Sequence, residues 1–531
     1  MKNICQAEYI QSLIDNTPDG KTCLIPKGVY YIEKHINIFD RNKIIIDGSE
    51  STIIGHFNNG NSEIDTADIF HILNCINVEL CNFTITTDFP VNMTGNVKII
   101  DYDQGYYIVK VLDKYEVTGK EIFMIQNACD NERCFDDLDY YHPHPDKNKI
   151  TLLANEILLA GTYVDCPKEY LGNNQYKVYL PEHLLNSIHI GQRICIRHSS
   201  YGPVAILVKN SKNTSIYNIT INSFGGMGII VLPRSENLTL DKFNMFTDDD
   251  NQLMCGNCDA IHIAGLIGTL KMFNCYFDGL GDDALNIHSI AATVTKTDYH
   301  LRKLKCNYCK KTRDGLLSPD WCTKGDIIAV LDSSTCQRKG SFKVVDFLGD
   351  TLEYKDLAGT VSEGDILQNT LFSAAVKMNN CIIKRTRARA CVLQTENIEI
   401  KNCYFYGTSL PAIKAAPDVV KWYEVGPVKN MLIHNNTFEK CAFARQTLEQ
   451  PVITLQDNHD NISIGAQDIH RNVKITKNRF VNKNGRCIFV TSTNNLIIKE
   501  NTFINCNSYD NYKTVDCPNC RNAEVLLNRN T

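Results

Sequence analysis

The stretch NIEIKNCYF at residues 397–405 is one copy of an internal repeat that decides the fold. Its unit is an asparagine, an aliphatic residue, any residue, a second aliphatic residue, two polar residues and then an aromatic residue two places on. Further full copies lie at 430–438, 472–480 and 495–503, and shortened copies begin at residues 77 and 237. Short alternating strands that recur about every 20–25 residues between Asn and Gly turns are typical of a parallel β-solenoid. The repeat therefore predicts an all-β protein built as a right-handed parallel β-helix.

The repeated residue types are those that stacked coils require. One coil cannot bury its apolar face alone, so the coils stack and like residues form ladders. Asparagine tolerates left-handed backbone, and its amide can bond along the stack. We expect Phe405 and Phe438 to belong to a core ladder and the cysteines that follow asparagines to fill an inward turn ladder. These cysteines are Cys275, Cys381, Cys403 and Cys506.

Two stretches lack the asparagine repeat and contain separated alternating runs that predict antiparallel β insertions, barrel-like in form. Near the N-terminus, Tyr9, Ile10, Leu13 and Ile14 have helical spacing and predict a short helix that covers the open end of the solenoid. The expected organisation is a cap helix and first coils at 1–88, an insertion at 89–200, central coils at 201–290, a second insertion at 291–371 and C-terminal coils at 372–531.

Composition narrows the class of protein. The net charge is −5 over 531 residues, which does not resemble the basic surface of a nucleic-acid-binding protein. No stretch of 18 apolar residues exists, so we expect no membrane span. The 23 cysteines cannot pair completely, and such a number fits free thiols in a reducing compartment. The first 20 residues lack the apolar region of a signal peptide. We expect a cytoplasmic location, or secretion if a leader precedes this sequence, and leave a homodimer open.

The chemistry is carried by segments that align without gaps. DAIHI at 259–263 matches DALNI at 283–287, and both match RACVL at 389–393 and PAIKA at 411–415. The first two start 24 residues apart (283 − 259), the length of one coil. This spacing puts Asp259 and Asp283 in adjacent rungs, about 4.8 Å apart along the stack. Asp282 lies beside them.

The alternation within each strand sorts the side chains. If the aliphatic residues point inward, the polar residues between them point outward on one wall; these are His262, Asn286, His288 and Lys414. Strict alternation would also turn Asp259 and Asp283 inward. A bend just before each strand must therefore re-aim these carboxylates, and Gly281 provides one. The same polar residues could equally form an ordinary polar ladder on a solvated wall.

Three neighbouring carboxylates cannot all stay ionised at low cost. Like charges raise at least one pKa, which leaves a protonated acid beside an ionised base. Glycoside hydrolysis needs this pairing, an acid for the leaving oxygen and a carboxylate that activates water. Carboxylates several ångströms apart leave room for that water and predict inversion.

At these residues a family resemblance becomes specific. NCD at 257–259 followed by GDD at 281–283 is similar to the signatures of polygalacturonase-type β-helix hydrolases. The wider context more closely resembles glycoside hydrolase family 110, whose members are inverting exo-α-galactosidases acting on terminal α-1,3-linked galactose, including blood-group B structures. The segments that carry this resemblance are GDDALNIHS at 281–289, RARACVLQT at 387–395 and WYEVGPVKNMLIHNNTF at 422–438.

The resemblance implies roles for individual residues. Asp282 would be the general acid, and Asp259 and Asp283 would share the attacking water. Trp422 and Glu424 would line the galactose pocket. The Gly-His-Gly and Arg-x-Lys motifs of polygalacturonases are not recognisable at the matching distance, which counts against a pectin substrate.

Other functions stay open at this point. A hydrolase acting on uronates or another hexose would pair a substrate carboxylate with Arg387, Arg389 or Lys414. A non-catalytic β-solenoid adhesin or glycan-binding protein would not need three converging aspartates. A β-elimination lyase would want calcium and a lone basic catalyst. We expect no cofactor and no resident metal, although Cys306 and Cys309 with Cys322 would be the best zinc candidate.

Overall fold

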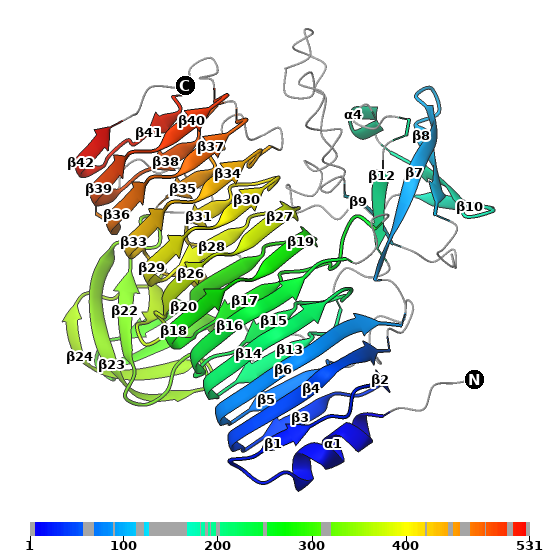
Figure 1. Cartoon of the computed structure of the whole chain (residues 1–531). Helices are drawn as coiled ribbons and strands as arrows, with labels where there is room; N and C mark the ends of the chain where they lie inside the picture. Colours follow the sequence, from blue (N-terminus) through cyan, green and yellow to red (C-terminus); the bar gives the residue numbers. More distant parts are fainter. Residues whose placement is uncertain are drawn as a thin grey trace.

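The computed structural model describes residues 6–56, 68–88, 91–112, 122–126, 167–180, 182–185, 190–191, 193–197, 202–247, 252–308, 320–419, 422–443, 450–456, 468–483, 485–506 and 513–526. Within these residues the chain forms a stack of coils with three parallel walls and two insertions (Figure 1). The predicted all-β fold with a parallel β-helix is confirmed.

The first two walls share four long strands at the N-terminal end, which run through the corner between them. These are β4 (Asn42–Gly55), β6 (Ile76–Thr87), β14 (Lys212–Ile221) and β16 (Glu236–Met245). The first wall adds β1 (Thr22–Leu24), β18 (Ile267–Phe273), β26 (Ala375–Asn379), β29 (Glu396–Lys401), β33 (Lys429–His434), β36 (His470–Thr476), β39 (Thr493–Lys499) and β42 (Arg521–Leu526). The second wall adds β2 (Val29–Ile32), β19 (Tyr276–Leu280), β27 (Ile382–Thr386), β30 (Tyr404–Tyr406), β34 (Thr437–Glu439), β37 (Arg479–Val481) and β40 (Thr502–Ile504).

The third wall carries the aligned polar segments. Its strands are β3 (Ile36–Phe39), β5 (Phe70–Leu73), β13 (Ile206–Lys209), β15 (Ile229–Val231), β17 (Ile261–Ala264), the start of β20 (Leu285–Asp298), β28 (Cys391–Gln394), β31 (Ile413–Ala415), β35 (Ile453–Leu455), β38 (Ile488–Val490) and β41 (Val515–Asp516). All of these pairings are parallel, so each wall repeats the register of the coil before it.

Ladders of like residues hold the coils together. Asn397, Asn430, Asn472 and Asn495 all have φ between +56° and +61°. The last three each donate their side-chain amide to the side-chain oxygen of the asparagine one coil before, at 2.8–2.9 Å. Inside the stack the rings of Phe405, Phe438, Phe480 and Phe503 lie nearly parallel, with centroids 4.8–5.2 Å apart. The ladder cysteines Cys275, Cys381, Cys403 and Cys506 are buried, and their thiols donate to backbone carbonyls. Every cysteine that the structure describes is a free thiol.

The helix α1 (Ala7–Asn16) closes the N-terminal end of the stack, as its spacing predicts. Ala7, Ile10 and Ile14 are buried against the first coils, whereas Tyr9 is largely exposed. The buried residues lie at i, i+3 and i+7, which is one face of a helix. This helix covers apolar residues that the first coil would otherwise leave in water.

The first insertion follows β6 and has its own apolar core. Its elements are β7 (Asn92–Asp101), β8 (Tyr106–Val111), β9 (Ile122–Gln126), β10 (Lys168–Gly172), β11 (Gln175–Tyr179), α4 (Glu182–Leu185) and β12 (Arg193–Arg197). The strands pair antiparallel in the order β10-β11-β8-β7-β12-β9. As described, this insertion is a six-stranded antiparallel sheet.

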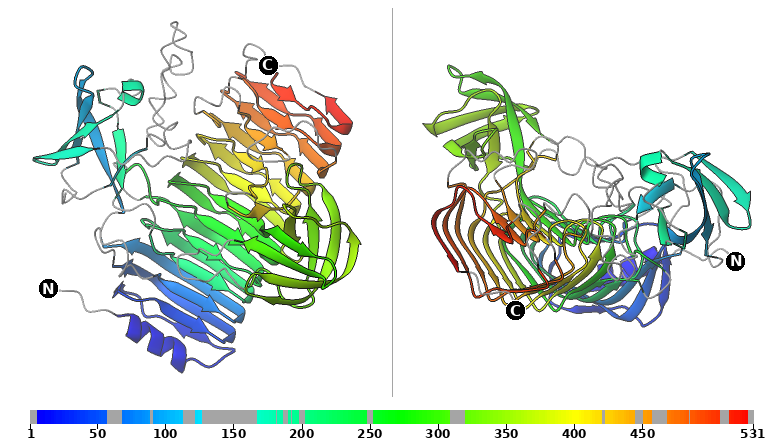
Figure 2. Two further views of the ribbon diagram at one scale, coloured as in Figure 1. Left: turned by 180° about the vertical axis from the view of Figure 1, so that it is seen from behind. Right: turned by 90° about the horizontal axis from the view of Figure 1, so that it is seen from above.

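The second insertion is a closed antiparallel barrel with its own core around Trp321. It joins the far half of β20 to β21 (Lys303–Tyr308), β22 (Ile327–Leu331), β23 (Arg338–Leu348), β24 (Thr351–Gly359) and β25 (Ile366–Asn369). The two insertions project to opposite sides of the coil stack (Figure 2). Because β20 begins in the third wall and ends in the barrel, the barrel is tied directly to that wall.

Candidate active site

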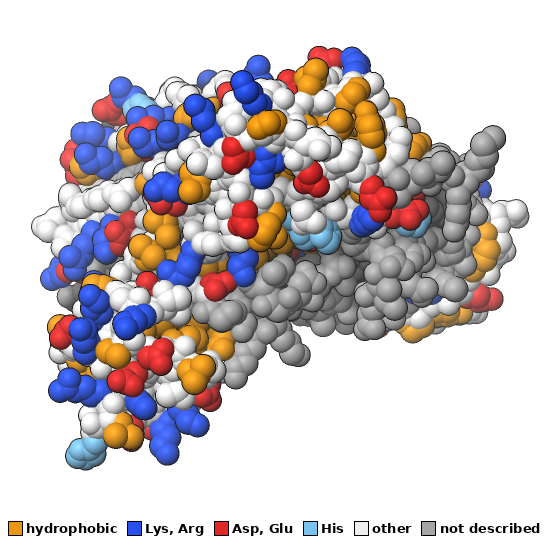
Figure 3. All heavy atoms as spheres, turned by 90° about the horizontal axis from the view of Figure 1, so that it is seen from below, with side chains coloured by type: hydrophobic (Ala, Val, Ile, Leu, Met, Phe, Trp, Pro, Cys, Tyr) orange, Lys and Arg blue, Asp and Glu red, His pale blue; other side chains and the backbone are white. Residues whose placement is uncertain are grey.

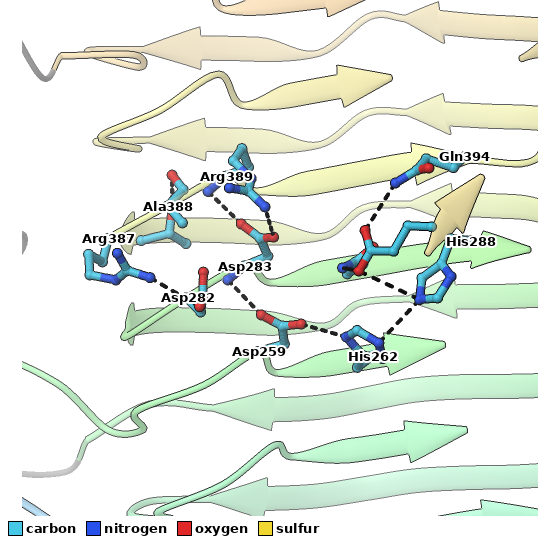
Figure 4. A network of polar contacts seen from close by, with 12 residues as sticks. Asp259, His262, Asp282, Asp283, His288, Arg387, Ala388, Arg389 and Gln394 are labelled. Atoms are coloured by element: carbon cyan, nitrogen blue, oxygen red, sulfur yellow. Dashed lines mark hydrogen bonds and ion pairs between the residues drawn. The ribbon is translucent and has the colours of Figure 1, made fainter. Parts of the chain in front are cut away.

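The three aspartates lie where the chain bends just before β17 and β20. The backbone N–H of Ala260 donates to the Asp283 carbonyl, and that of Ala284 donates to the Arg389 carbonyl, so the three aligned segments occupy one register. A side chain at Gly281 would place its Cβ 2.6 Å from two backbone carbonyl oxygens of the preceding coil. Only glycine therefore fits this bend, and the bend presents the carboxylates beside the wall instead of in the core (Figure 4).

Asp259 is tied to its neighbours through both carboxylate oxygens. Oδ1 accepts the backbone N–H of Asp283 at 3.1 Å, and Oδ2 lies 2.8 Å from Nδ1 of His262. Burial raises the pKa of Asp259, an effect that the hydrogen bond from His262 opposes. Asp259 is therefore a carboxylate whose ionised form depends on His262.

Asp283 is fully buried and clamped by one arginine. The backbone N–H of Arg389 donates to Oδ1 at 2.8 Å, and Nη2 of the same residue donates to Oδ2 at 2.7 Å. Burial raises the pKa of Asp283 to about 8 against the opposing charge of Arg389. The cluster thus stores a proton near neutral pH, as three neighbouring carboxylates are expected to do.

Asp282 is the most exposed of the three carboxylates, with 30% of its side chain open to solvent. Its Oδ2 lies 3.0 Å from Nη2 of Arg387, and the Arg387 Nε–H donates to the Gly281 carbonyl. Of the three side chains, it is the one that a bound molecule can reach most readily.

A second polar group lies beside the aspartates on the third wall. Nε2 of His262 is 3.2 Å from Nε2 of His288, and Nε2 of His288 is 3.8 Å from Oε1 of Glu424. Glu424 comes from β32 (Glu424–Val425), which pairs antiparallel with β20. Its two oxygens accept N–H groups from Asn286 at 3.2 Å and Gln394 at 3.1 Å. Burial raises the pKa of Glu424, but His288, His262 and Arg389 outweigh it and hold the pKa below its usual range.

Several buried polar atoms around the site have no hydrogen-bond partner among the described residues. They are Oδ1 of Asn286, Oε1 of Gln394, Oγ1 of Thr454 and Nε of Arg389. Lys414 lies between Val392 and Thr454 in the register of the wall, and burial lowers its pKa to about 7, with the charge of Arg389 acting in the same direction. An unpaired buried polar group costs about 1–3 kcal/mol of folding free energy. A polar ligand that forms hydrogen bonds with these atoms would remove that cost, so this wall can bind a polar ligand.

Each residue expected at the site can now be placed. The structure gathers Asp259, Asp282, Asp283, His262, Asn286, His288, Arg387, Arg389, Lys414 and Glu424 around β17, β20, β28, β31 and β32. Arg387 and Arg389 pair with the aspartates. Trp422, expected to line the pocket, lies two residues before Glu424 with 54% of its surface exposed.

Two residues were missed from the sequence, Gln394 and Thr454. Gln394 pairs with His288 in the register of the wall, and Thr454 pairs with Lys414. The signal that could have found them is position alone, because each follows the same outward alternation as His262 and Lys414.

Both insertions contact the loops that shape the site. From the first insertion, the amide of Asn92 donates to Oδ1 of Asn257, two residues before Asp259, at 3.3 Å. From the second, Asn307 donates to the Tyr423 hydroxyl at 2.8 Å, next to Glu424. The insertions therefore brace the segments that present the carboxylates.

Two groups of residues have ligand atoms within 4.8 Å of one another, namely Asp259 with Asp282 and Asp283, and His262 with His288 and Glu424. We assign a metal to neither, because arginines already neutralise two of the aspartates and amide N–H groups occupy both oxygens of Glu424. Of the zinc candidate, Cys306 and Cys322 are buried in the barrel core, and Cys309 lies outside the described residues.

Comparisons with known proteins agree with the fold. Residues 369–525 match the sequence model described as "Right handed beta helix region", in keeping with the predicted handedness. Solved structures to which the chain is distantly similar include an exopolygalacturonase of family 28 from Yersinia enterocolitica, with 12% identity, a TM-score of 0.42 and coverage of 98% of this chain and 76% of that chain. The surface adhesin PfbA of Streptococcus pneumoniae has 10% identity, a TM-score of 0.38 and coverage of 95% and 89%.

Curated relatives are closer in sequence. The chain is 26% identical over 329 residues to a protein named Alpha-1,3-galactosidase A from Bacteroides fragilis, covering 60% of this chain and 53% of the relative. It is 24% identical over 546 residues to Alpha-1,3-galactosidase B from Bacteroides thetaiotaomicron, covering 95% and 84%. The chain thus spans about half the length of the first relative and most of the second. These names confirm the resemblance drawn from the motifs.

Two further features bear on partners. On the face shown in Figure 3, Lys and Arg side chains are interspersed with Asp and Glu. No described helix has the length and apolar character needed to cross a membrane.

Proposed function

We propose that this protein is an exo-glycosidase that hydrolyses terminal α-1,3-linked galactose, with inversion at the anomeric carbon. The observation that carries the proposal is the convergence of three carboxylates on one wall, beside buried polar atoms that lack partners among the described residues. The galactose substrate comes from the names of the curated relatives and remains a proposal for this chain.

Asp282 acts as the general acid in this proposal. It is the most exposed carboxylate, so it can approach the glycosidic oxygen of a bound sugar. When the bond between the anomeric carbon and this oxygen breaks, the leaving oxygen takes the proton of Asp282.

Asp259 and Asp283 activate the attacking water. Asp259 accepts the water proton as the water oxygen bonds to the anomeric carbon, and Asp283 orients the same water. The hydrogen bond from the Asp283 backbone to Oδ1 of Asp259 keeps the two side chains in one arrangement.

The spacing of the three carboxylates differs from the spacing that is common in inverting glycosidases. Carboxyl groups of inverting glycosidases are commonly about 6.5–9.5 Å apart. Here the nearest oxygens of all three aspartates lie within 4.8 Å of one another. Inversion therefore rests on the family resemblance, and the stereochemistry of the product is the decisive measurement.

Sugar hydroxyls would satisfy the unpaired atoms of the wall. The orphan oxygens of Asn286, Gln394 and Thr454 are acceptors, and a hexose presents several O–H donors. An exposed tryptophan at position 422 can stack on the apolar face of galactose.

A uronate substrate is the less favoured candidate. It would need cations to pair its carboxylate, yet Arg387 and Arg389 are already paired with Asp282 and Asp283. Only Lys414 would then remain among the three cations expected for this role.

Mass spectrometry of sugar release tests the proposal. The chain is incubated with α-1,3-, α-1,4- and α-1,6-linked galactosides, β-linked galactosides, α-glucosides and oligogalacturonides. Free galactose from the α-1,3-linked substrate is expected, and the Asp282→Asn variant should release far less. No release from any galactoside, or release from oligogalacturonides alone, would reject the proposal. Binding without turnover would favour a glycan-binding protein.

A further inference from the structure

Two histidine rings face each other across adjacent rungs of the third wall, in an arrangement that needs a shared proton. The Nε2 atoms of His262 and His288 are 3.2 Å apart, and the rings lie at 76° to each other. A hydrogen bond at this distance requires that one of the two nitrogens carry the hydrogen. Otherwise two lone pairs would face each other in a buried site.

The outer nitrogens decide which ring donates. Nδ1 of His288 lies 2.8 Å from the backbone carbonyl of Ser289, which only accepts, so this nitrogen carries a hydrogen. Burial lowers the pKa of His288, with the charge of Glu424 opposing it. A neutral His288 with its hydrogen on Nδ1 has a lone pair on Nε2. The bridging hydrogen therefore belongs to Nε2 of His262.

The other nitrogen of His262 faces the carboxylate of Asp259. Nδ1 and Oδ2 are 2.8 Å apart, a distance of a strong hydrogen bond. With Nε2 already protonated, this contact is either an imidazolium donating to a carboxylate or a neutral ring accepting from a carboxylic acid. In both forms one proton lies between Nδ1 of His262 and Oδ2 of Asp259. Only the first form leaves Asp259 ionised and able to take a proton from water.

We propose that His262 is a positioning residue that is protonated on both nitrogens, bridges to His288 and holds Asp259 in its ionised, water-activating form. This role rests on the proposed function, because it acts through the carboxylate assigned there as the base. In this arrangement Nδ1–H of His262 donates to the Asp259 carboxylate, and Nε2–H donates to Nε2 of His288 on the far side of the ring.

The charges around His262 favour the imidazolium. Asp259 precedes it in the chain, Glu424 approaches from β32, and Asp283 lies at the adjacent rung, two residues before β20. Burial lowers the pKa of His262, but the hydrogen bond and charge of Asp259, with the charges of Glu424 and Asp283, outweigh it and raise the pKa. The cations of the same wall are Arg389 and Lys414, and Arg389 is paired with Asp283.

Kinetics of two substitutions at one position test the role. His262→Ala removes the donor, whereas His262→Asn places an amide N–H close to the position of Nδ1. We expect kcat to fall about 10- to 100-fold in His262→Ala, the size expected when one hydrogen bond to a charged group is lost. The KM should stay within about threefold, since the ring acts through Asp259. His262→Asn should recover most of the lost kcat.

The pH profile separates positioning from simple packing. Without the imidazolium the pKa of Asp259 rises, so the acidic limb of kcat/KM should move to higher pH in His262→Ala. His434→Ala is the matched control, because His434 lies on the first wall and contacts Thr476. An unmoved acidic limb, or a rise in KM at unchanged kcat, would overturn the proposal. Failure of His262→Asn to recover kcat would also overturn it.

A spectroscopic readout works without turnover. In protein labelled with ¹⁵N-histidine, we expect an imidazolium signal at neutral pH that disappears in His262→Asn and becomes a neutral ring in Asp259→Asn. A neutral His262 in the unsubstituted protein would overturn the proposal even if the protein releases galactose. Absence of galactose release with the imidazolium present would instead count against the proposed function. Elemental analysis of the purified protein adds one further test. A bound metal that is lost in His262→Ala would mean that a metal ion, and not a proton, bridges the two histidines, and would overturn the proposal.

Discussion

The first and third walls of the coil stack are built on the same register and differ in what they stack. On the first wall Asn397, Asn430, Asn472 and Asn495 repeat at one position, and three amide bonds link these four residues in series. At the corresponding positions of the third wall the residues are His262, Asn286, Val392, Lys414 and Thr454. One wall pairs like with like, whereas the other places unlike groups side by side.

The difference separates stability from function. A ladder of identical residues pairs each amide with the next one and adds a similar stabilisation at each coil. The third wall instead buries carboxylates with raised pKa values and leaves Asn286, Gln394 and Thr454 with unpaired atoms. These features cost stability and are tolerated where a site must meet a ligand. Substitutions on the third wall should therefore reduce activity with little loss of stability, and substitutions in the ladders should reduce stability with little loss of activity.

The largest effect is expected for Asp259→Asn on the third wall. Loss of the base should reduce kcat about 10²–10⁴-fold on every galactoside, because water must be activated whatever leaves. The melting temperature should change little. Asp241→Asn is the control, since Asp241 accepts from Asn274 in the ladder of the first wall. Initial rates measure the activity of both variants. An equal loss of activity in the two would contradict the claim that the third wall carries the catalytic residues and the first wall does not.

Asp282→Asn should differ from Asp259→Asn in its dependence on the leaving group. An activated aryl galactoside needs little proton assistance, so the loss should be smaller on it than on the natural linkage. Initial rates on both substrates provide the measurement. A loss of equal size on both would remove Asp282 from the acid role.

Phe438→Ala tests the ladder beneath the walls. Phe438 is buried between Phe405 and Phe480, so its removal leaves a cavity and should lower the free energy of unfolding by about 3–5 kcal/mol. The kcat/KM of the folded variant should be unchanged. Urea unfolding measures the loss, with Phe39→Ala as the control at a largely exposed position. A free energy of unfolding close to that of the unsubstituted protein would mean that Phe438 does not contribute to the core.

The pH dependence of stability should reveal the buried carboxylate. The pKa of Asp283 is about 8 in the fold and 3.8 as its ordinary value, so between these pH values the folded state binds a proton that the unfolded state does not. Stability should therefore fall as pH rises from about 4 to about 8. In Asp283→Asn this contribution is absent, and the difference between the two urea midpoints across the window isolates it. A difference that does not vary with pH would mean that Asp283 is ionised throughout.

Asn430→Ala should give the smallest change. Asn430 has φ of 57°, which costs a residue with a Cβ about 1–2 kcal/mol, and its ladder bonds are also lost. We expect a loss of about 1–2 kcal/mol, with Asn430→Gly losing less because glycine adopts this backbone freely. Chemical unfolding of both variants checks the order, and equal losses in the two would mean that the amide bonds alone matter.

The same contrast explains what could be predicted from sequence. The asparagine and phenylalanine ladders repeat, so the coils and their register follow from the pattern. The 24-residue interval (283 − 259) likewise indicates that Asp259 and Asp283 are neighbours. Thr454 and Gln394 were missed because the residue type at these outward positions changes from coil to coil. The pairing of Arg389 with Asp283 spans the whole barrel insertion, and only the structure shows that its guanidinium meets the carboxylate.

The stereochemistry of hydrolysis tests the central claim most directly. Proton NMR of the first galactose released from an α-1,3-linked substrate, recorded before mutarotation, reports the configuration at the anomeric carbon. The account predicts β-galactose, because Asp259 and Asp283 deliver water from the face opposite the leaving oxygen. Early α-galactose would mean that a carboxylate attacks the sugar itself, and would contradict the assignment of Asp259 and Asp283 as the pair that activates water.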